Sequence, residues 1–212
     1  KYIVTLTLLV KRGEATWRAL TEEQQQRMES VVATLKQVGT AKAHIQLGDL
    51  YEEGKGVPQD FAEAMVWYRK DADQGNANAQ WCVGCLHGNG QGVKQNYAEA
   101  VRWLRKAAEQ GFAEAQYSLG DMHYNGQGVK KDYTEAAQCY RKAADQGHPD
   151  AQSNLGAMYH HGKGVEQDNA EAARWFRMAA EQGHAQAQYN LGCCYRDGEG
   201  VDQARSELHP PK

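Results

Sequence analysis

The sequence predicts an all-α protein, a right-handed α-α superhelical solenoid of stacked helix-turn-helix repeats. The first observation behind this prediction is internal repetition, because the 212-residue chain matches itself at a period of 36 residues. The second is that each period contains two segments whose apolar residues recur at helical spacing. One helix pair cannot bury its apolar side alone, so consecutive pairs are expected to stack.

Composition excludes several classes of protein. The chain has 24 Lys and Arg against 27 Asp and Glu, and this slightly acidic balance is not typical of a nucleic-acid-binding protein. No apolar run approaches the roughly 20 residues that cross a bilayer, so no membrane span is predicted. The apolar run at residues 2–10 is interpreted either as the remnant of a signal peptide or as a first packed element. The five cysteines favour a reducing, cytoplasmic compartment, and export stays open.

The N-terminal part precedes the regular repeats. Residues 1–20 match no repeat, and the only element expected there is a helix around residues 14–20. Residues 21–39 predict one amphipathic helix, which opens with a capping box at Thr21. Its closing Gly39 lies 36 residues before Gly75, which closes the first full repeat. We therefore expect this helix to act as the N-terminal cap of the stack.

Each repeat contains the same start and stop signals. The first helix is expected to end at a Gly-x-Gly-Val turn, because glycine accepts the left-handed conformation of a helix C-terminus. The second helix is expected to open with a capping box, in which Asp or Asn accepts from backbone N–H groups and a Glu reaches back. The turns begin at Gly54, Gly90, Gly126, Gly162 and Gly198, and the boxes at Asp60, Asn96, Asp132 and Asp168. A glycine inside each first helix, such as Gly48, predicts a close approach between helices.

These signals define the domain organisation. The repeats occupy residues 40–201, as four full units of 36 residues and a partial fifth, and residues 202–212 form a tail. The last first helix leaves Leu191 and Tyr195 without a following helix to cover them. Such an apolar edge predicts self-association through the C-terminal end of the stack.

The repeat resembles that of a known family. The first unit reads Ala43, Leu47-Gly48, Tyr51, Gly54-Lys55-Gly56-Val57, Asp60, Glu63-Ala64, Trp67-Tyr68-Arg69-Lys70 and Gln74-Gly75. This pattern is similar to the Sel1-like repeat (SLR), a branch of the tetratricopeptide-repeat superfamily, and units this regular are typical of bacterial members. The resemblance implies a scaffold or adaptor for protein–protein interaction, with no catalysis of its own.

A candidate partner-binding groove follows from comparing the units with one another. Positions 42, 45, 49, 52 and 53 of the first unit differ from their counterparts, and at about 100° per residue they share one face of the first helix. By resemblance to tetratricopeptide repeats, this face is the concave one. The predicted groove residues are Ile45, Asp49, Glu52, Glu53, Trp81, Cys85, Glu114, Tyr117, Asp121, Tyr124, Asn125, His160, His161 and Tyr189. Aromatic anchors among acids predict a protein or peptide ligand of basic and apolar character. The alternative is neutral variation, with the aromatic side chains serving packing.

Catalytic, metal and cofactor chemistry is not predicted. The Cys82-x-x-Cys85 pair lies inside a helix, whereas a thioredoxin-like site needs a βαβ frame, and no second ligand pair has zinc spacing. A cysteine-rich subset of the family is linked to β-lactam hydrolysis, and its cysteine pair falls on Ala108 and Gln116 here. The alternative function is therefore a β-lactam hydrolase or a cysteine- or metal-dependent enzyme of that subset.

Overall fold

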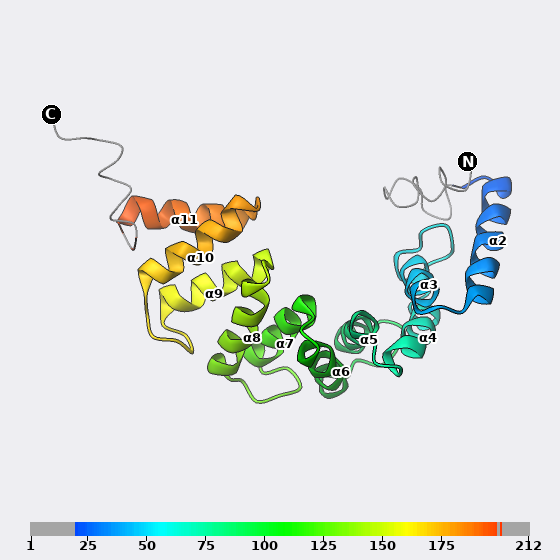
Figure 1. Ribbon diagram of the computed structural model, residues 1–212, viewed down its shortest axis with the longest axis horizontal. Coiled ribbons are helices and arrows are strands. Elements are labelled where there is room, and N and C mark those ends of the chain that lie inside the picture. Colours follow the sequence, from blue (N-terminus) through cyan, green and yellow to red (C-terminus); the bar gives the residue numbers. More distant parts are fainter. Residues whose placement is uncertain (1–19, 199, 201–212) are drawn as a thin grey trace. The chain divides into compact units, whose positions relative to one another are not determined.

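The computed structural model describes residues 20–198 and 200. Within these residues it contains ten helices and no β-strand (Figure 1). The helices are α2 (Glu22–Val38), α3 (Ala41–Glu53), α4 (Phe61–Ala72), α5 (Ala77–Asn89), α6 (Tyr97–Glu109), α7 (Ala113–Asn125), α8 (Tyr133–Asp145), α9 (Pro149–His161), α10 (Asn169–Glu181) and α11 (Ala185–Asp197). The predicted all-α solenoid of helix pairs is confirmed. The expectations for the segment before residue 20 and for the tail at 202–212 lie outside the described residues.

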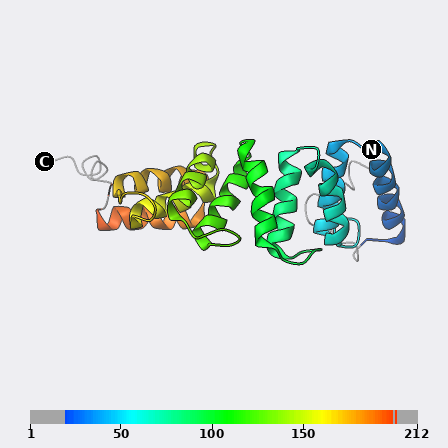
Figure 2. The ribbon, with the colours of Figure 1, turned by 90° about the horizontal axis from the view of Figure 1, so that it is seen from below.

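The chain divides into two compact units, residues 1–106 and 107–212. In the first unit, α3 packs against both α2 and α4, and α4 packs against α5. In the second unit, each helix from α7 to α11 packs against the next along the chain, and Figure 2 shows them side by side. Odd-numbered helices from α3 onward are the first helices of the repeats, and even-numbered ones are the second.

The first helices end as the glycine turns predict. Gly126 has φ +72° and follows α7, and its N–H donates to the Met122 carbonyl at 2.9 Å. This left-handed cap recurs after α3, α5, α9 and α11. The helix then cannot continue, and the chain turns back into the second helix of the pair.

In the described chain, the second helices have only one half of the predicted capping box, the bond from backbone N–H groups to the capping side chain. Asp60 accepts from the Ala62 and Glu63 N–H groups at 2.9 and 3.0 Å. The prediction that Glu63 accepts a hydrogen bond from the backbone of the capping residue is wrong. Glu63 Oε1 instead accepts from the indole N–H of Trp67 at 3.0 Å. Glu99 and Trp103 repeat this bond in α6. In α4 and α6 the motif glutamate therefore holds a core tryptophan in place, whereas the indole N–H of Trp175 in α10 has no such partner. Among the described helices, α2 has a complete capping box.

The glycine inside each of α3, α5, α7 and α9 accommodates a large side chain. A Cβ on Gly156 would lie 2.8 Å from the ring of Phe176 in α10 and 3.2 Å from the Ala172 carbonyl. The equivalent neighbours are Tyr68 at Gly48, Leu104 at Gly84 and Tyr140 at Gly120. The predicted close approach between helices is present, and the group that needs the space is mainly a side chain of the second helix.

The second glycine of the Gly-x-Gly turn serves the contact between successive repeats. Gly164 has φ +69°, and its missing Cβ would lie 2.7 Å from Thr134 N and closer still to the Tyr133 carbonyl. Gly92 approaches Phe61 and Ala62 in the same way. In both cases the turn of one repeat rests on the N-terminus of the preceding second helix, where a side chain has no room.

A glutamine near the start of each first helix from α5 onward joins it to the preceding second helix, and this side chain is buried in α5, α7 and α9. Gln152 is 1% exposed, and its Nε2 donates to the Ala144 carbonyl at 3.1 Å. The same bond links Gln80 to Ala72 at 3.1 Å, Gln116 to Ala108 at 3.2 Å and Gln188 to Ala180 at 3.2 Å. Ala108 and Gln116 are the positions that resemble the cysteine pair of the subset linked to β-lactam hydrolysis. In this chain a hydrogen bond from Gln116 to the Ala108 carbonyl joins them.

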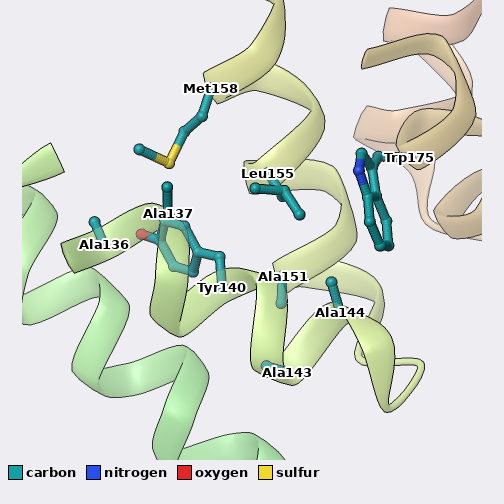
Figure 3. Packing of buried hydrophobic residues seen from close by; sticks show 9 residues of the cluster. All are labelled: Ala136, Ala137, Tyr140, Ala143, Ala144, Ala151, Leu155, Met158 and Trp175. Carbon is teal, nitrogen blue, oxygen red and sulfur yellow. The ribbon is translucent and has the colours of Figure 1, made fainter. Parts of the chain in front are cut away.

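Apolar side chains from consecutive helices form the core of the second unit (Figure 3). Leu155 of α9 lies between Tyr140 of α8 and Trp175 of α10, and Met158 lies one turn further along α9. All four are buried, with Leu155 fully inaccessible.

Candidate partner-binding face

The acidic residues predicted in the first unit contact a buried tyrosine. The Tyr68 hydroxyl lies 2.8 Å from Asp49 Oδ1 and 2.7 Å from Glu52 Oε2, both on α3. Burial raises the pKa of Asp49, against the lowering effect of the hydrogen bond from Tyr68. Glu53 is exposed and forms an ion pair with Lys55 at 2.6 Å. Asp49 and Glu52 therefore satisfy a core phenol as well as forming part of the surface.

The remaining predicted residues of the first unit are partly packed. Ile45 and Trp81 lie against the cluster of buried residues around Tyr68. Cys85 is half-buried on α5, and burial, with the Glu52 charge as a smaller cause, raises the pKa of its thiol to about 12. The pKa of the buried Cys82 thiol is raised for the same main reason. Both thiols are consequently protonated at neutral pH and are poor nucleophiles.

Two cavities lie on the face of the first helices in the second unit. The first, here called the Asp121 cavity, has a volume of about 270 Å³ and is lined by Asp121, Tyr124, Asn125, Tyr140, Asn154, Ala157, Met158, His161 and Lys163. The second, called the Phe176 cavity, has about 240 Å³ and is lined by Ala157, His160, His161, Phe176, Asn190, Cys193, Cys194 and Asp197. Ala157 and His161 belong to both, so the two cavities are neighbours.

The two cavities are successive copies of one feature. Adding the period of 36 to each residue of the Asp121 cavity from Asp121 to His161 gives the lining of the Phe176 cavity. In each cavity two first helices supply the walls, and the second helix between them contributes one aromatic side chain, Tyr140 or Phe176. Two successive steps of the second unit therefore each carry a concave site that can hold one side chain, and the residues at the variable positions decide its chemistry.

The polar groups of the Asp121 cavity are held in place. The Tyr140 hydroxyl donates to Asp121 Oδ1 at 2.6 Å. Burial raises the pKa of the Asp121 carboxyl, although hydrogen bonds from Tyr140 and Tyr117 act in the opposite direction. At the rim, Lys163 Nζ donates to the Tyr124 hydroxyl at 3.1 Å. Burial and the neighbouring His160 lower the pKa of His161, so its imidazole is neutral at neutral pH.

Some predicted residues of the second unit lie outside both cavities. Tyr117 stacks on His148 with ring centroids 4.7 Å apart, and burial raises its pKa to about 12. Glu114 is exposed at the start of α7. Tyr189 on α11 is 67% exposed. The structure thus brings Asp121, Tyr124 and Asn125 together with His161 at the Asp121 cavity, and both histidines together at the Phe176 cavity. Tyr117, Glu114 and Tyr189 line neither cavity, although Tyr117 hydrogen-bonds to Asp121.

Sequence reasoning missed several lining residues. Ala157 and Cys193 occupy the same repeat position as Asp121, so the periodic comparison contained the signal for them. Asn154 and Asn190 lie one position beyond Tyr117-type residues, on the flank of the face that the comparison selected. Tyr140 and Phe176 come from second helices, and nothing in the spacing of the first helices identifies them.

The last first helix exposes part of its surface. Tyr195 is 42% exposed and its hydroxyl accepts from Arg177 at 3.1 Å, while Leu191 is half-buried. Self-association through this edge stays a prediction. Between residues 20 and 198, no group of three or more His, Cys, Asp or Glu is placed to hold a metal ion, and no helix is long and apolar enough to cross a bilayer.

Comparison with known proteins identifies the family. The profile of the Sel1 repeat matches residues 41–76, 77–112, 113–148, 149–184 and 185–207, which is most of the chain. This protein belongs to the Sel1 repeat family. Members of the family commonly serve as protein-interaction scaffolds. A comparison with curated proteins gives no match.

Solved Sel1 repeat structures share the fold. A protective antigen of uropathogenic Escherichia coli with an SLR fold is 41% identical, with a TM-score of 0.77 over 86% of this chain and 39% of its own. A Sel1 repeat protein from Oxalobacter formigenes is 39% identical, with a TM-score of 0.73 over 77% of this chain and 67% of its own. Cysteine-rich protein B of Helicobacter pylori is 30% identical, with a TM-score of 0.51 over 63% of this chain and 96% of its own. The chain thus spans about two fifths of the length of the E. coli antigen.

Proposed function

We propose that this Sel1 repeat protein is an interaction scaffold that binds a peptide segment of a partner protein on the face of its first helices. The observation that carries the proposal is the pair of equivalent cavities between α7, α9 and α11. They lie at positions that differ from repeat to repeat, while the packing positions of the same helices keep their character. Variation confined to a hollowed face is what recognition of a particular partner needs.

The size of the cavities favours side chains over small metabolites. Volumes of about 240 and 270 Å³ fall below the ~300–1,000 Å³ typical of small-molecule sites. Each can take one large side chain, and neighbouring cavities can take two side chains of the same peptide. Aromatic and thiol groups in the lining supply apolar contact, and Asn154 and Asn190 supply amides that match a peptide backbone.

A ligand of basic and apolar character is part of this proposal. In the first unit, Asp49 and Glu52 add negative charge at the Tyr68 hydroxyl, and the half-buried Trp81 packs against the cluster that contains Tyr68. In the second, Asp121 is the acidic group of its cavity, and Tyr124 lies at the rim. We assign no catalytic role to this face. Stoichiometric metal in the purified chain, or hydrolysis of a chromogenic β-lactam, would instead support an enzyme of the cysteine-rich subset.

The test starts by selecting peptides from a random phage-displayed library on the full chain. The tightest selected peptide, labelled with a fluorophore, is then titrated with the native chain and with two variants of matched size change. Ala157→Leu fills the wall shared by both cavities, whereas Ala98→Leu adds the same atoms at an exposed position of α6. We expect the Kd to rise by about tenfold or more for Ala157→Leu and to stay unchanged for Ala98→Leu. Unchanged affinity for a correctly folded Ala157→Leu chain would contradict the proposal.

A further inference from the structure

Aspartates on the binding face occur in those repeats whose second helix supplies a tyrosine. Where the second helix supplies a tyrosine, the first helix of the same repeat supplies an aspartate that accepts from its hydroxyl. The pairs are Asp49 with Tyr68 at 2.8 Å and Asp121 with Tyr140 at 2.6 Å. In the other two full repeats both polar groups are absent together, with Cys85 and Leu104 in one and Ala157 and Phe176 in the other. The acid and the phenol are thus gained or lost as a pair.

The buried phenol alone does not require a charge. Tyr140 is 2% exposed and needs a hydrogen-bond acceptor, which the neutral amide of an asparagine also provides. The chain instead has a carboxylate in a half-buried position, where desolvation raises its pKa and disfavours the ionised form. A charged group kept at a position where a neutral one satisfies the fold points to a role in recognition.

No cation of the described residues neutralises Asp121. Its hydrogen-bond partners are the phenols of Tyr140 and Tyr117, and no Lys, Arg or His of the described chain lies within ion-pair distance. Lys163 at the rim is engaged with the Tyr124 hydroxyl and the faces of Tyr124 and Tyr133. His148, whose charge acts on Asp121, has its own carboxylate neighbour in Asp150.

The Phe176 cavity has the opposite character at the same positions. Ala157 stands where the first cavity has Asp121, and Phe176 stands where it has Tyr140. Its remaining acid, Asp197, is bound by Arg196 at 2.8 Å. Apolar and neutral groups therefore line the part of this cavity that corresponds to the charged part of the first.

We propose that the two cavities read two side chains of one peptide, the Asp121 cavity taking a lysine or arginine and the Phe176 cavity an uncharged, apolar side chain. This inference rests on the proposed function and deepens it by naming the ligand chemistry. The cation pairs with Asp121 in a partly desolvated site, where charge pairing is stronger than in water. The two cavities share Ala157 and His161, so the two side chains are expected close to one another in the peptide sequence.

The test is a double-mutant cycle on the selected, labelled peptide. Its basic residue is changed to glutamine, and the full-length protein carries Asp121→Asn, which keeps the acceptor for Tyr140 and removes the charge. With the native chain, the peptide change is expected to raise Kd by about tenfold or more; with Asp121→Asn, by less than about twofold. Asp145→Asn, at an exposed position near the end of α8, serves as the matched control and is expected to behave as native.

The outcomes separate the two proposals. Asp121→Asn is expected to unfold at the same temperature as the native chain or higher, so a loss of coupling cannot come from misfolding. A second outcome is that selected peptides bind Ala157→Leu more weakly and yet lack a basic residue or show no coupling to Asp121. This result would overturn the proposed cation site at Asp121 and support peptide binding at the cavities. If no peptide is selected, or if Ala157→Leu binds as well as native, both proposals are overturned.

Discussion

Replacing Gly164 with alanine tests whether the second glycine of the turn is required by contact between repeats. An L-residue at φ +69° costs about 1–2 kcal/mol for its left-handed conformation. The new Cβ would also lie 2.7 Å from Thr134 N and closer still to the Tyr133 carbonyl, which are backbone atoms that cannot rotate away. Overpacking of this kind costs about 1–3 kcal/mol more.

Gly183→Ala is the matched control for this change. Gly183 also has positive φ, +85°, but a Cβ there meets nothing within 4 Å. Both variants share the conformational cost, so the difference between them isolates the contact with the preceding repeat. We expect Gly164→Ala to unfold at a midpoint roughly 2–12 °C below Gly183→Ala, from about 1–3 kcal/mol at about 2–4 °C per kcal/mol.

Far-UV circular dichroism with heating, and urea unfolding followed by the same signal, measure this difference. Because the stability of a repeat array depends on interfaces between neighbours, Gly164→Ala is also expected to broaden the unfolding transition. Equal midpoints for Gly164→Ala and Gly183→Ala would refute the reasoning, since the close approach would then cost nothing.

Three further predictions concern buried polar groups and thiols. Gln152→Ala should lower the free energy of unfolding by about 1–3 kcal/mol in urea titrations, because the buried amide's bonds to the Ala144 carbonyl and from Gln182 are both lost; stability equal to native would exclude this role. Cys82 and Cys85 should react slowly with a thiol reagent at pH 8 in the folded chain and quickly after unfolding, because burial raises the pKa of both thiols, that of Cys85 to about 12. In the unfolded chain these thiols lose their protons above about pH 9, whereas in the folded chain they keep them to higher pH. The free energy of unfolding should therefore be unaffected by the thiols at neutral pH and should fall as pH rises from about 9 toward about 12. A free energy of unfolding that does not change over this pH range would contradict the prediction. His44→Ala should destabilise the chain by about 1–3 kcal/mol in thermal unfolding, because it removes the 2.8 Å hydrogen bond to the buried Asp71 carboxylate; His44→Gln should recover part of the loss, and equal stability of all three chains would argue against the pair.

Local patterns were sufficient to predict the helices. Capping residues, glycine stops and apolar spacing act over four residues or fewer, and the same signals recur in every unit, so each repeat supports the interpretation of the others. The helix from Glu22 to Val38 shows this, since Thr21 and Gln24 form the complete capping box that the sequence indicates. The Gly126 cap shows it at the other end of a helix.

Contacts between elements were harder to predict, because they depend on how closely two helices approach. Glu63 has the spacing of a capping box, yet the indole of Trp67 one turn away competes for the same carboxylate and binds it. Gly164 has the signature of a turn residue, and only packing reveals that it lies against Tyr133 of the preceding repeat. The bond from Gln152 to Ala144 spans two helices and leaves no mark in the spacing of either.

In the candidate site too, spacing along one helix predicted some residues, and packing between helices decided the others. The helical period correctly grouped Asp121, Tyr124 and Asn125 on one face, because residues three and four apart are neighbours on a helix. It could not identify Tyr140, which reaches the cavity from a second helix. It also could not separate Tyr117, whose ring is stacked on His148, from the residues that line the cavity.

The most direct test of peptide binding at the cavities is methyl NMR of the methionines, with the library-selected peptide as the probe. Met158 lines the Asp121 cavity, whereas Met178 is 43% exposed on α10 and Met28 is buried in α2, both outside the cavities. Titration with the peptide is predicted to shift the Met158 methyl signal and to leave those of Met178 and Met28 in place. Binding that shifts Met178 or Met28 while the Met158 signal stays unchanged would contradict the account.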